Sequence, residues 1–241
     1  MNVQNAGFYL ALVVVGSTSF AQAEEMTIPG EFSATVVVVS DYANRGISLS
    51  NGDVAMQSSI DWSHDSGAYL GVSGSNVDFG NGTHFEMSVY GGHAGEVSAV
   101  TYDVMILGYL YPGTKTGSQD FMEFSLALGY DAGFAAVSAG VAVSPEFYLR
   151  SGVGTHIGAG LAVPVPLGYT ADRGIDLRVD ANFGVQILEN FPDYVYYNAG
   201  LGLEVFDFKV DVRYVGTGYT GGSGFGLIDD DRVVFGISRE F

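Results

Sequence analysis

Apolar and polar side chains alternate along much of this chain, most clearly toward its C-terminal end. Successive side chains of a strand point to opposite faces, so strict alternation predicts a strand with one apolar and one polar face. In residues 175–187, one face carries Ile175, Leu177, Val179, Ala181, Phe183, Val185 and Ile187, and the other carries Asp176, Arg178, Asp180, Asn182 and Gln186. Residues 193–205 and 207–217 repeat the pattern. The pattern predicts strands with one face toward apolar surroundings and the other toward water.

Segments of this kind recur along the whole chain, separated by Gly, Asp, Asn, Ser or Pro. We expect about twelve strands, an even number that suits a barrel whose two ends lie on the same side of the membrane. The predicted strands are 31–41, 53–63, 67–78, 83–93, 98–111, 120–130, 133–144, 155–164, 173–187, 193–205, 207–217 and 231–241. The last strand places Val233, Phe235, Ile237 and Phe241 on one face. The predicted fold class is all-β, a transmembrane antiparallel barrel, and a soluble β-sandwich is a more distant alternative.

The predicted connections alternate in length, as the two ends of such a barrel do. Tight turns are expected at Asp65-Ser66-Gly67, Asp131-Ala132-Gly133 and Phe206-Asp207, and longer outer loops at 42–52, 112–120 and 218–230. The segment 164–173 breaks this rule, because it is long where a short connection is expected.

The first 23 residues have the features of an export signal. A short apolar run, 8–15, is followed by the small-x-small sequence Ala21-Gln22-Ala23, after which a signal peptidase would cleave. The run is far shorter than the roughly 20 apolar residues of a membrane-spanning helix. We therefore expect a cleaved signal peptide at 1–23 and a barrel domain at 24–241, although no Lys or Arg precedes the apolar run.

Composition agrees with an exported barrel. The 241 residues include no cysteine, which excludes disulfides, thiolate nucleophiles and cysteine-ligated metals. The formal net charge of -18 argues against nucleic-acid binding, because phosphates would be repelled. The mean hydropathy is nevertheless +0.24, so the acids share the chain with a large apolar surface. With no long apolar run after residue 23, such a chain would cross a bilayer only as a closed barrel.

Several strings of residues resemble one known family. The sequence VVSDYANRGIS at 38–48, then Ile60-Asp61-Trp62-Ser63-His64 and the stretch 71–79, is similar to the opening of the TorF family of bacterial porin candidates, formerly an uncharacterised family. The stretches 109–113 and 233–241 resemble its middle and end. This resemblance implies an outer-membrane porin with no established substrate and no catalytic residues. Arg239 departs from the apolar or aromatic residue common at the third position from the end of such barrels.

The polar faces supply the candidate lumen. The candidate lumen-lining residues are Asp61, Glu86, Asp103, Glu123, Asp176, Arg178, Asp180, Asn198, Glu204, Lys209, Asp211 and Arg213. Their charges either pair into ladders that brace the wall or line a path for solutes. Because acids outnumber bases, a channel is expected to favour cations and neutral solutes over anions. The alternative function is a structural or surface-interaction barrel with a plugged lumen, which side chains or an infolded loop would block.

The rim of the barrel offers further candidates. Asp41 and Arg45 are expected to form a salt bridge that fixes the first outer loop, with Gly46 permitting a sharp return. An Arg45 that contacts solutes is the alternative. Asp229, Asp230 and Asp231 suit either a solvated loop end or a Ca²⁺ ion, and the solvated reading is favoured.

Nothing in the sequence predicts catalysis. Gly216 to Gly221 matches G-x-G-x-x-G, but no helix or βαβ unit follows, so an outer loop is expected there. The four histidines are not spaced as metal ligands, and no Ser, His and acid converge. The prediction is a non-enzyme with no cofactor and no metal, in the outer membrane of a Gram-negative bacterium. Its expected partners are membrane lipid, small hydrophilic solutes and, through Phe241, the outer-membrane assembly machinery, with no nucleic acid.

Overall fold

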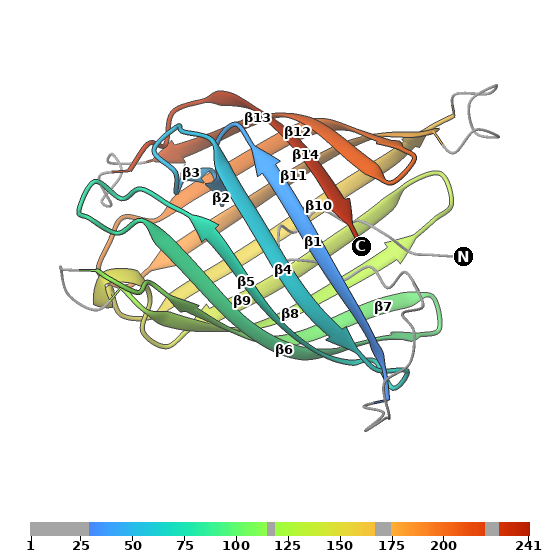
Figure 1. The fold of residues 1–241 in the computed structure, drawn as a ribbon, viewed down its shortest axis with the longest axis horizontal. Helices are drawn as coiled ribbons and strands as arrows, with labels where there is room; N and C mark the ends of the chain where they lie inside the picture. Colours follow the sequence, from blue (N-terminus) through green and yellow to red (C-terminus); the bar gives the residue numbers. More distant parts are fainter. Residues whose placement is uncertain (1–28, 115–118, 167–174, 220–226) are drawn as a thin grey trace.

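Twelve long strands close into a single antiparallel barrel in the computed structural model, which describes residues 29–114, 119–166, 175–219 and 227–241 (Figure 1). The barrel strands are β1 (Glu31–Val39), β4 (Ala55–Ser63), β5 (Ala68–Asn76), β6 (Phe85–Val97), β7 (Val100–Leu110), β8 (Phe121–Asp131), β9 (Ala136–Ser144), β10 (Gly154–Val165), β11 (Ile175–Leu188), β12 (Tyr194–Val205), β13 (Phe208–Tyr219) and β14 (Arg232–Glu240). The predicted fold class and the twelve predicted strands are confirmed. Even the Ala- and Gly-rich β9 pairs along its full length with β10, from Ser144 opposite Gly154 to Ala136 opposite Ala162.

The first and last strands close the barrel. β1 pairs with β14 from Thr35 opposite Glu240 to Val39 opposite Gly236, and its other edge pairs with β4. Ala34 and Phe241 exchange two backbone hydrogen bonds of 3.1 and 2.8 Å next to the pair Thr35–Glu240, where β1 begins and β14 ends. Closure leaves no sheet edge, so the backbone N–H and C=O groups of the strands are paired with one another.

The two faces of the barrel wall differ as the alternation predicts. On β11, Phe183 is 53% exposed on the outside, whereas Asp180 is 4% exposed and Gln186 fully buried on the inside. The outer face of β14 carries Val233, Phe235 and Ile237 in the same way. Because each wall is one sheet thick, a buried strand residue here faces the barrel interior. The exterior is therefore apolar and the interior polar, as in transmembrane barrels.

Arg239 lies on the outer face, and its surroundings explain its departure from the usual apolar residue. Its guanidinium carbon lies 5.3 Å from the ring centre of Phe208 and 4.8 Å from that of Phe241. Its Nη2 atom lies 3.1 Å from a carboxylate oxygen of Asp207 in the β12–β13 turn. Two aromatic faces and one acid thus accommodate the charge at the rim.

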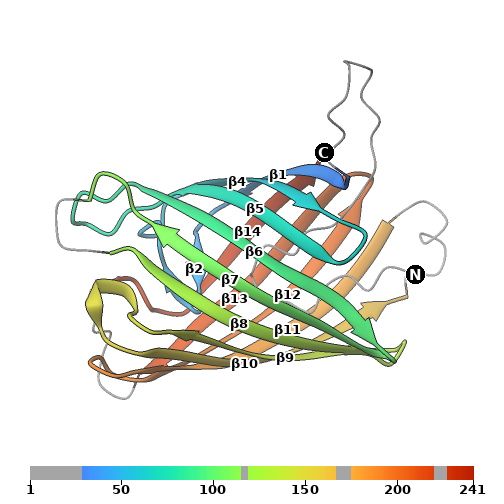
Figure 2. The ribbon, with the colours of Figure 1, turned by 90° about the horizontal axis from the view of Figure 1, so that it is seen from below.

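Apart from the connection between β10 and β11, most of which lies outside the described residues, the connections alternate between short and long, and the long ones gather at one end (Figure 2). The short ones join β4 to β5, β6 to β7, β8 to β9 and β12 to β13. A short 3-10 helix, η1 (Tyr148–Arg150), lies in the outer loop between β9 and β10. Val165, expected in a connection, extends β10 by one residue beyond the predicted strand 155–164. Residues 167–174 and the predicted signal at 1–23 lie outside the described residues. In the described part of the chain, no helix has the length and apolar character needed to cross a membrane.

The apolar exterior makes a first prediction. Leu161 lies near the middle of β10 with its side chain 45% exposed on the outer face. We expect Leu161→Arg to lower the free energy of unfolding in lipid bilayers by about 2 to 4 kcal/mol, because it places a charge in hydrocarbon. Urea unfolding of protein reconstituted in vesicles measures this cost. Phe134→Arg is the matched control, because Phe134 is 77% exposed in the β8–β9 turn, and equal losses in both variants would contradict a lipid-facing wall.

Candidate functional site

The first outer loop, residues 40–54, folds back as a small hairpin. Its two short strands are β2 (Ala43–Asn44) and β3 (Ile47–Ser48), which pair in antiparallel register. The two residues between them, Arg45 and Gly46, have φ angles of +48° and +83°. A two-residue hairpin of this kind requires a positive φ at both turn positions, and Gly46 supplies one without strain. The predicted sharp return at Gly46 is therefore present.

This hairpin contacts strands all around the barrel, so it lies inside the lumen. The Tyr42 hydroxyl donates a hydrogen bond of 2.9 Å to Glu86 on β6. Gly46 packs against Tyr196 of β12 and Thr217 of β13, where an added Cβ would lie 2.3 Å from the Thr217 methyl carbon. Burial and the nearby Glu86 carboxylate raise the pKa of Tyr42, so its hydroxyl remains a donor.

Arg45 forms the strongest link between the hairpin and the wall. Its Nη1 and Nη2 atoms donate to the two carboxylate oxygens of Glu123 on β8 at 2.7 and 2.8 Å. Nη1 also donates to Oε1 of Gln186 on β11 at 3.0 Å. Glu123 and Gln186 are buried, so this is a bidentate ion pair shielded from water, the geometry in which a guanidinium and a carboxylate match best.

The predicted Asp41–Arg45 salt bridge is wrong. Asp41 is buried and instead accepts hydrogen bonds from Ser48, from Ser50 at 3.0 Å and from the Arg232 guanidinium of β14. The hairpin turn sends Arg45 toward β8 and β11 while Asp41 stays at the base of the loop beside β14. Each of the two residues therefore holds the loop, but to different parts of the wall.

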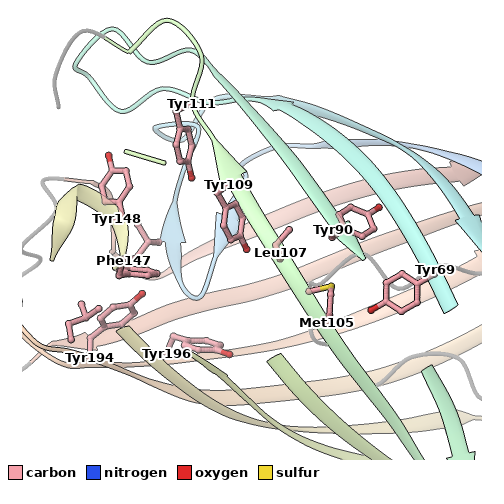
Figure 3. Packing of buried hydrophobic residues seen from close by; sticks show 12 residues of the cluster. Tyr69, Tyr90, Met105, Leu107, Tyr109, Tyr111, Phe147, Tyr148, Tyr194 and Tyr196 are labelled. Atoms are coloured by element: carbon pink, nitrogen blue, oxygen red, sulfur yellow. The ribbon is translucent and has the colours of Figure 1, made fainter. Parts of the chain in front are cut away.

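Aromatic rings lie around the hairpin in the outer half of the lumen (Figure 3). The buried rings in this half belong to Tyr109, Tyr111, Phe147, Tyr148, Tyr194 and Tyr196. Tyr111 donates to Glu86 at 2.7 Å, and fully buried Gln119 links Thr83 to Tyr148 through hydrogen bonds of 2.6 and 3.0 Å. Among the sequence candidates, Glu86 and Glu123 thus belong to this packed outer half.

The other candidates occupy the wall toward the short-turn end. Arg213 donates to both carboxylate oxygens of Asp180 at 2.7 and 3.0 Å and contacts Asp211 at 3.0 Å. It also donates to Asn198 at 2.5 Å, while Arg178 lies 3.6 Å from Asp180. These residues form the bracing network that one reading of the sequence expects.

Two further acids on the opposite wall have only neutral partners in the described structure. Asp61 accepts hydrogen bonds from the hydroxyl of Tyr90 and, at 2.8 Å, from that of Ser59. Asp103 accepts one from Tyr69 at 2.7 Å. Near the short-turn end, Glu204 lies opposite Asp176 on one side and opposite Lys209 on the other. These three residues form no ion pair with one another in the described chain. Unlike Asp180 and Asp211, none of these acids forms an ion pair with a basic side chain in the described structure.

A third part of the wall carries only small side chains. The inward residues in the middle of β8, β9 and β10 are Ser125, Ala127, Ser138, Gly140, Ala142, Gly158 and Gly160. They are register neighbours on three adjacent strands, so they form one continuous surface between Glu123 and the short-turn end of the barrel. This surface adjoins the polar and charged residues of β11 to β13, because β10 pairs directly with β11.

The acidic loop end shows no metal site. Asp231 accepts hydrogen bonds from Tyr197 at 2.9 Å and Tyr214 at 2.5 Å, and these hydroxyls lower its pKa. Asp229 and Asp230 offer their backbone oxygens to Thr217 and Arg232. No group of three or more His, Cys, Asp or Glu in the described residues could hold a metal ion. Of the G-x-G-x-x-G match, Gly216 to Tyr219 lie in β13 and the remainder lies outside the described residues.

The close fit of Gly46 makes a second prediction. Gly46→Ala should drive the hairpin from the lumen, because the new methyl group meets Thr217 and Tyr196. Gly52→Ala is the matched control: its φ of +77° imposes a similar strain of about 1 to 2 kcal/mol, but its nearest neighbour lies at 3.6 Å. We expect trypsin to cut after Arg45 faster in Gly46→Ala than in Gly52→Ala or the wild type. Equal cleavage of the two variants would contradict the packing described for Gly46.

The buried ion pair makes a third prediction. Arg45→Ala and Glu123→Gln should each lower the free energy of unfolding by about 3 kcal/mol, and the double variant by much less than the sum, because each single change leaves a buried group unpaired. Urea unfolding in detergent micelles measures the coupling. Arg150→Ala is the control, because Arg150 is exposed on η1, and it should change stability by no more than about 0.5 kcal/mol. Additive losses would show that the pair does not hold the loop.

Comparisons with known proteins agree with this architecture. The KdgM porin superposes with a TM-score of 0.59 at 9% identity, over 87% of this chain and 99% of that one. The NanC porin gives a TM-score of 0.52 at 8% identity, over 86% and 98%. At such identities the likeness shows the fold alone, and no curated protein matches the sequence. Residues 23–241 match the model of a family described as a bacterial protein of unknown function, Gcw_chp, and the chain therefore belongs to that family.

Proposed function

We propose that this protein is an outer-membrane channel of a Gram-negative bacterium that lets small hydrophilic solutes diffuse passively. The observation that carries the proposal is the division of one closed wall into an apolar outer face and a polar inner face. The fold shared with the KdgM and NanC porins and the resemblance to the TorF family support the same function.

The proposed solute path runs beside the small-residue surface of β8 to β10. The inward side chains of Ser125, Ala127 and Ala142 are small there. Asp180, Asn198 and Arg213 lie on the neighbouring strands β11, β12 and β13. The hairpin of loop 40–54 forms the constriction at the outer end of this path. The lumen-lining role of the charged candidates belongs to this proposal.

The sign of the interior charge gives the channel a preference. Asp61, Glu86 and Asp103 receive only hydroxyl donors in the described structure, whereas Arg213 is shared between Asp180 and Asp211. The interior therefore attracts cations and admits neutral solutes more readily than anions.

The proposal also includes biogenesis. Residues 1–23 act as a signal peptide that is removed on export, and 24–241 form the mature barrel. The assembly machinery recognises the last strand through Phe241, whose ring is exposed on the outer face.

A barrel with a plugged lumen is the second candidate. Buried residues of the hairpin, such as Ile47 and Ser48, and the rings around it favour this reading, because they fill the outer half of the interior. Such a protein would act through its outer loops and would carry no current.

Electrical recording separates the two candidates and is the fourth prediction. In a planar bilayer under asymmetric KCl, we expect a small conductance whose reversal potential shows cation selectivity, because Asp61, Glu86 and Asp103 have no basic partner in the described structure. Asp61→Asn with Asp103→Asn should reduce that selectivity without abolishing the conductance. The outward-facing Phe134→Ala serves as the control and should leave both unchanged. A silent protein would support the plugged barrel, and anion selectivity would overturn the assignment of sign.

A further inference from the structure

Glu123 and Gln186 form a receptor for a guanidinium group on the barrel wall. Glu123 binds both terminal nitrogens of Arg45, and Gln186 adds a third hydrogen bond through Oε1. The side chains of both wall residues are almost entirely buried, at 2% and 0% exposure. The group they bind reaches them from a loop rather than from the wall.

The receptor is built from the most continuous part of the structure. β8 pairs with both β7 and β9, and β11 pairs with both β10 and β12, through Gln186 itself. Arg45, in contrast, lies at the tip of a hairpin whose two strands pair only with each other. Movement of the hairpin would therefore remove the ligand and leave the receptor in place.

Without Arg45, the Glu123 carboxylate and the Gln186 side-chain oxygen would lose the hydrogen bonds that Arg45 donates to them. Glu123 has no other basic partner in the described chain, so its carboxylate would be buried without a counter-charge. The Nε2 atom of Gln186 is buried and has no hydrogen-bond partner in the described structure even with Arg45 present. The site thus offers a carboxylate, an amide oxygen and an unused amide donor.

The surroundings of the site suit a planar cation. Tyr109 and Tyr194 belong to the buried cluster that encloses the hairpin (Figure 3), and His156 is the register neighbour of Gln186. Guanidinium groups stack on aromatic faces and are more weakly hydrated than ammonium groups, so they enter such a site at lower cost.

We propose that Glu123 and Gln186 are a binding site for solutes that carry a guanidinium group, and that Arg45 is a tethered occupant which these solutes displace. Displacement releases the strongest hold on the hairpin, so a solute of this class would open its own path. The opening step rests on the proposed channel function, whereas binding at Glu123 and Gln186 does not.

Chemical complementation tests the binding site. Methylguanidinium should raise the temperature at which the folded Arg45→Ala barrel unfolds, measured as the loss of the folded band on a gel. The protection should be half-maximal at a methylguanidinium concentration on the order of 1 mM. Tetramethylammonium has the same charge but no N–H donors and should need at least about tenfold higher concentration. Arg45→Ala with Glu123→Gln should gain nothing from methylguanidinium. Arg150→Ala, whose receptor is still filled by Arg45, should gain nothing either.

Two outcomes of that assay would overturn the site. One is equal protection by both cations, and the other is equal protection of the double variant. If Arg45→Ala does not refold, refolding yield with and without methylguanidinium becomes the measurement. A yield restored by methylguanidinium but not by tetramethylammonium supports the site, and no restoration refutes it.

Recording from Arg45→Ala in bilayers separates this inference from the channel proposal. We expect methylguanidinium to reduce its current at the concentrations that protect it from heat. A silent variant that methylguanidinium still protects would end the channel proposal and leave the binding site standing. A conducting variant with no protection and no block would do the reverse.

Discussion

Backbone hydrogen bonding in hydrocarbon is the constraint on which this structure depends. An unpaired N–H or C=O group in lipid costs several kcal/mol, so every strand must have two neighbours. The five residue pairs between β1 and β14, together with the bonds between Ala34 and Phe241, meet that requirement at the seam. Closure then sorts the side chains, because alternate residues must face lipid and lumen in turn.

Closure also creates an interior space, and the protein places a loop in the outer half of it. Bringing Arg45 into that space removes its charge from water, which is unfavourable unless the charge meets a matched partner. Glu123 and Gln186 supply that partner in bidentate geometry. Similarly, Asp41 is buried only where Ser48, Ser50 and Arg232 surround it. The inserted loop is therefore held by charge pairs that are costly to separate and directional enough to fix one position.

The alternation of side chains predicted the barrel because that pattern is local and is repeated in every strand. β11, β12 and β13 show how far this extends, since nearly every residue of their predicted faces lies on the side expected. The hairpin was not predicted, because its contacts are not local: Arg45 meets Glu123 at a separation of 78 residues and Gln186 at 141. The sequence prediction instead paired Arg45 with Asp41, the nearest opposite charge along the chain. The positive φ of Arg45 depends on the same tertiary contacts, since an Arg-Gly pair is a weaker turn signal than Asn-Gly.

The motif SDYxxRGIS acquires a physical meaning once these contacts are combined. Ser40 accepts a hydrogen bond from the backbone of Phe235, and Asp41 binds Arg232 on the same strand, so both tie the start of the loop to β14. Tyr42 reaches β6, Arg45 reaches β8 and β11, and Gly46 fits against β12 and β13. One short segment thus contacts six of the twelve barrel strands. Its contacts to β14 and β6 are made near the base of the hairpin, whereas those of Arg45 are made at the tip. Loss of the Arg45 pair would therefore leave the tip held by the packing of Gly46 alone, while charged and polar contacts still anchor the base.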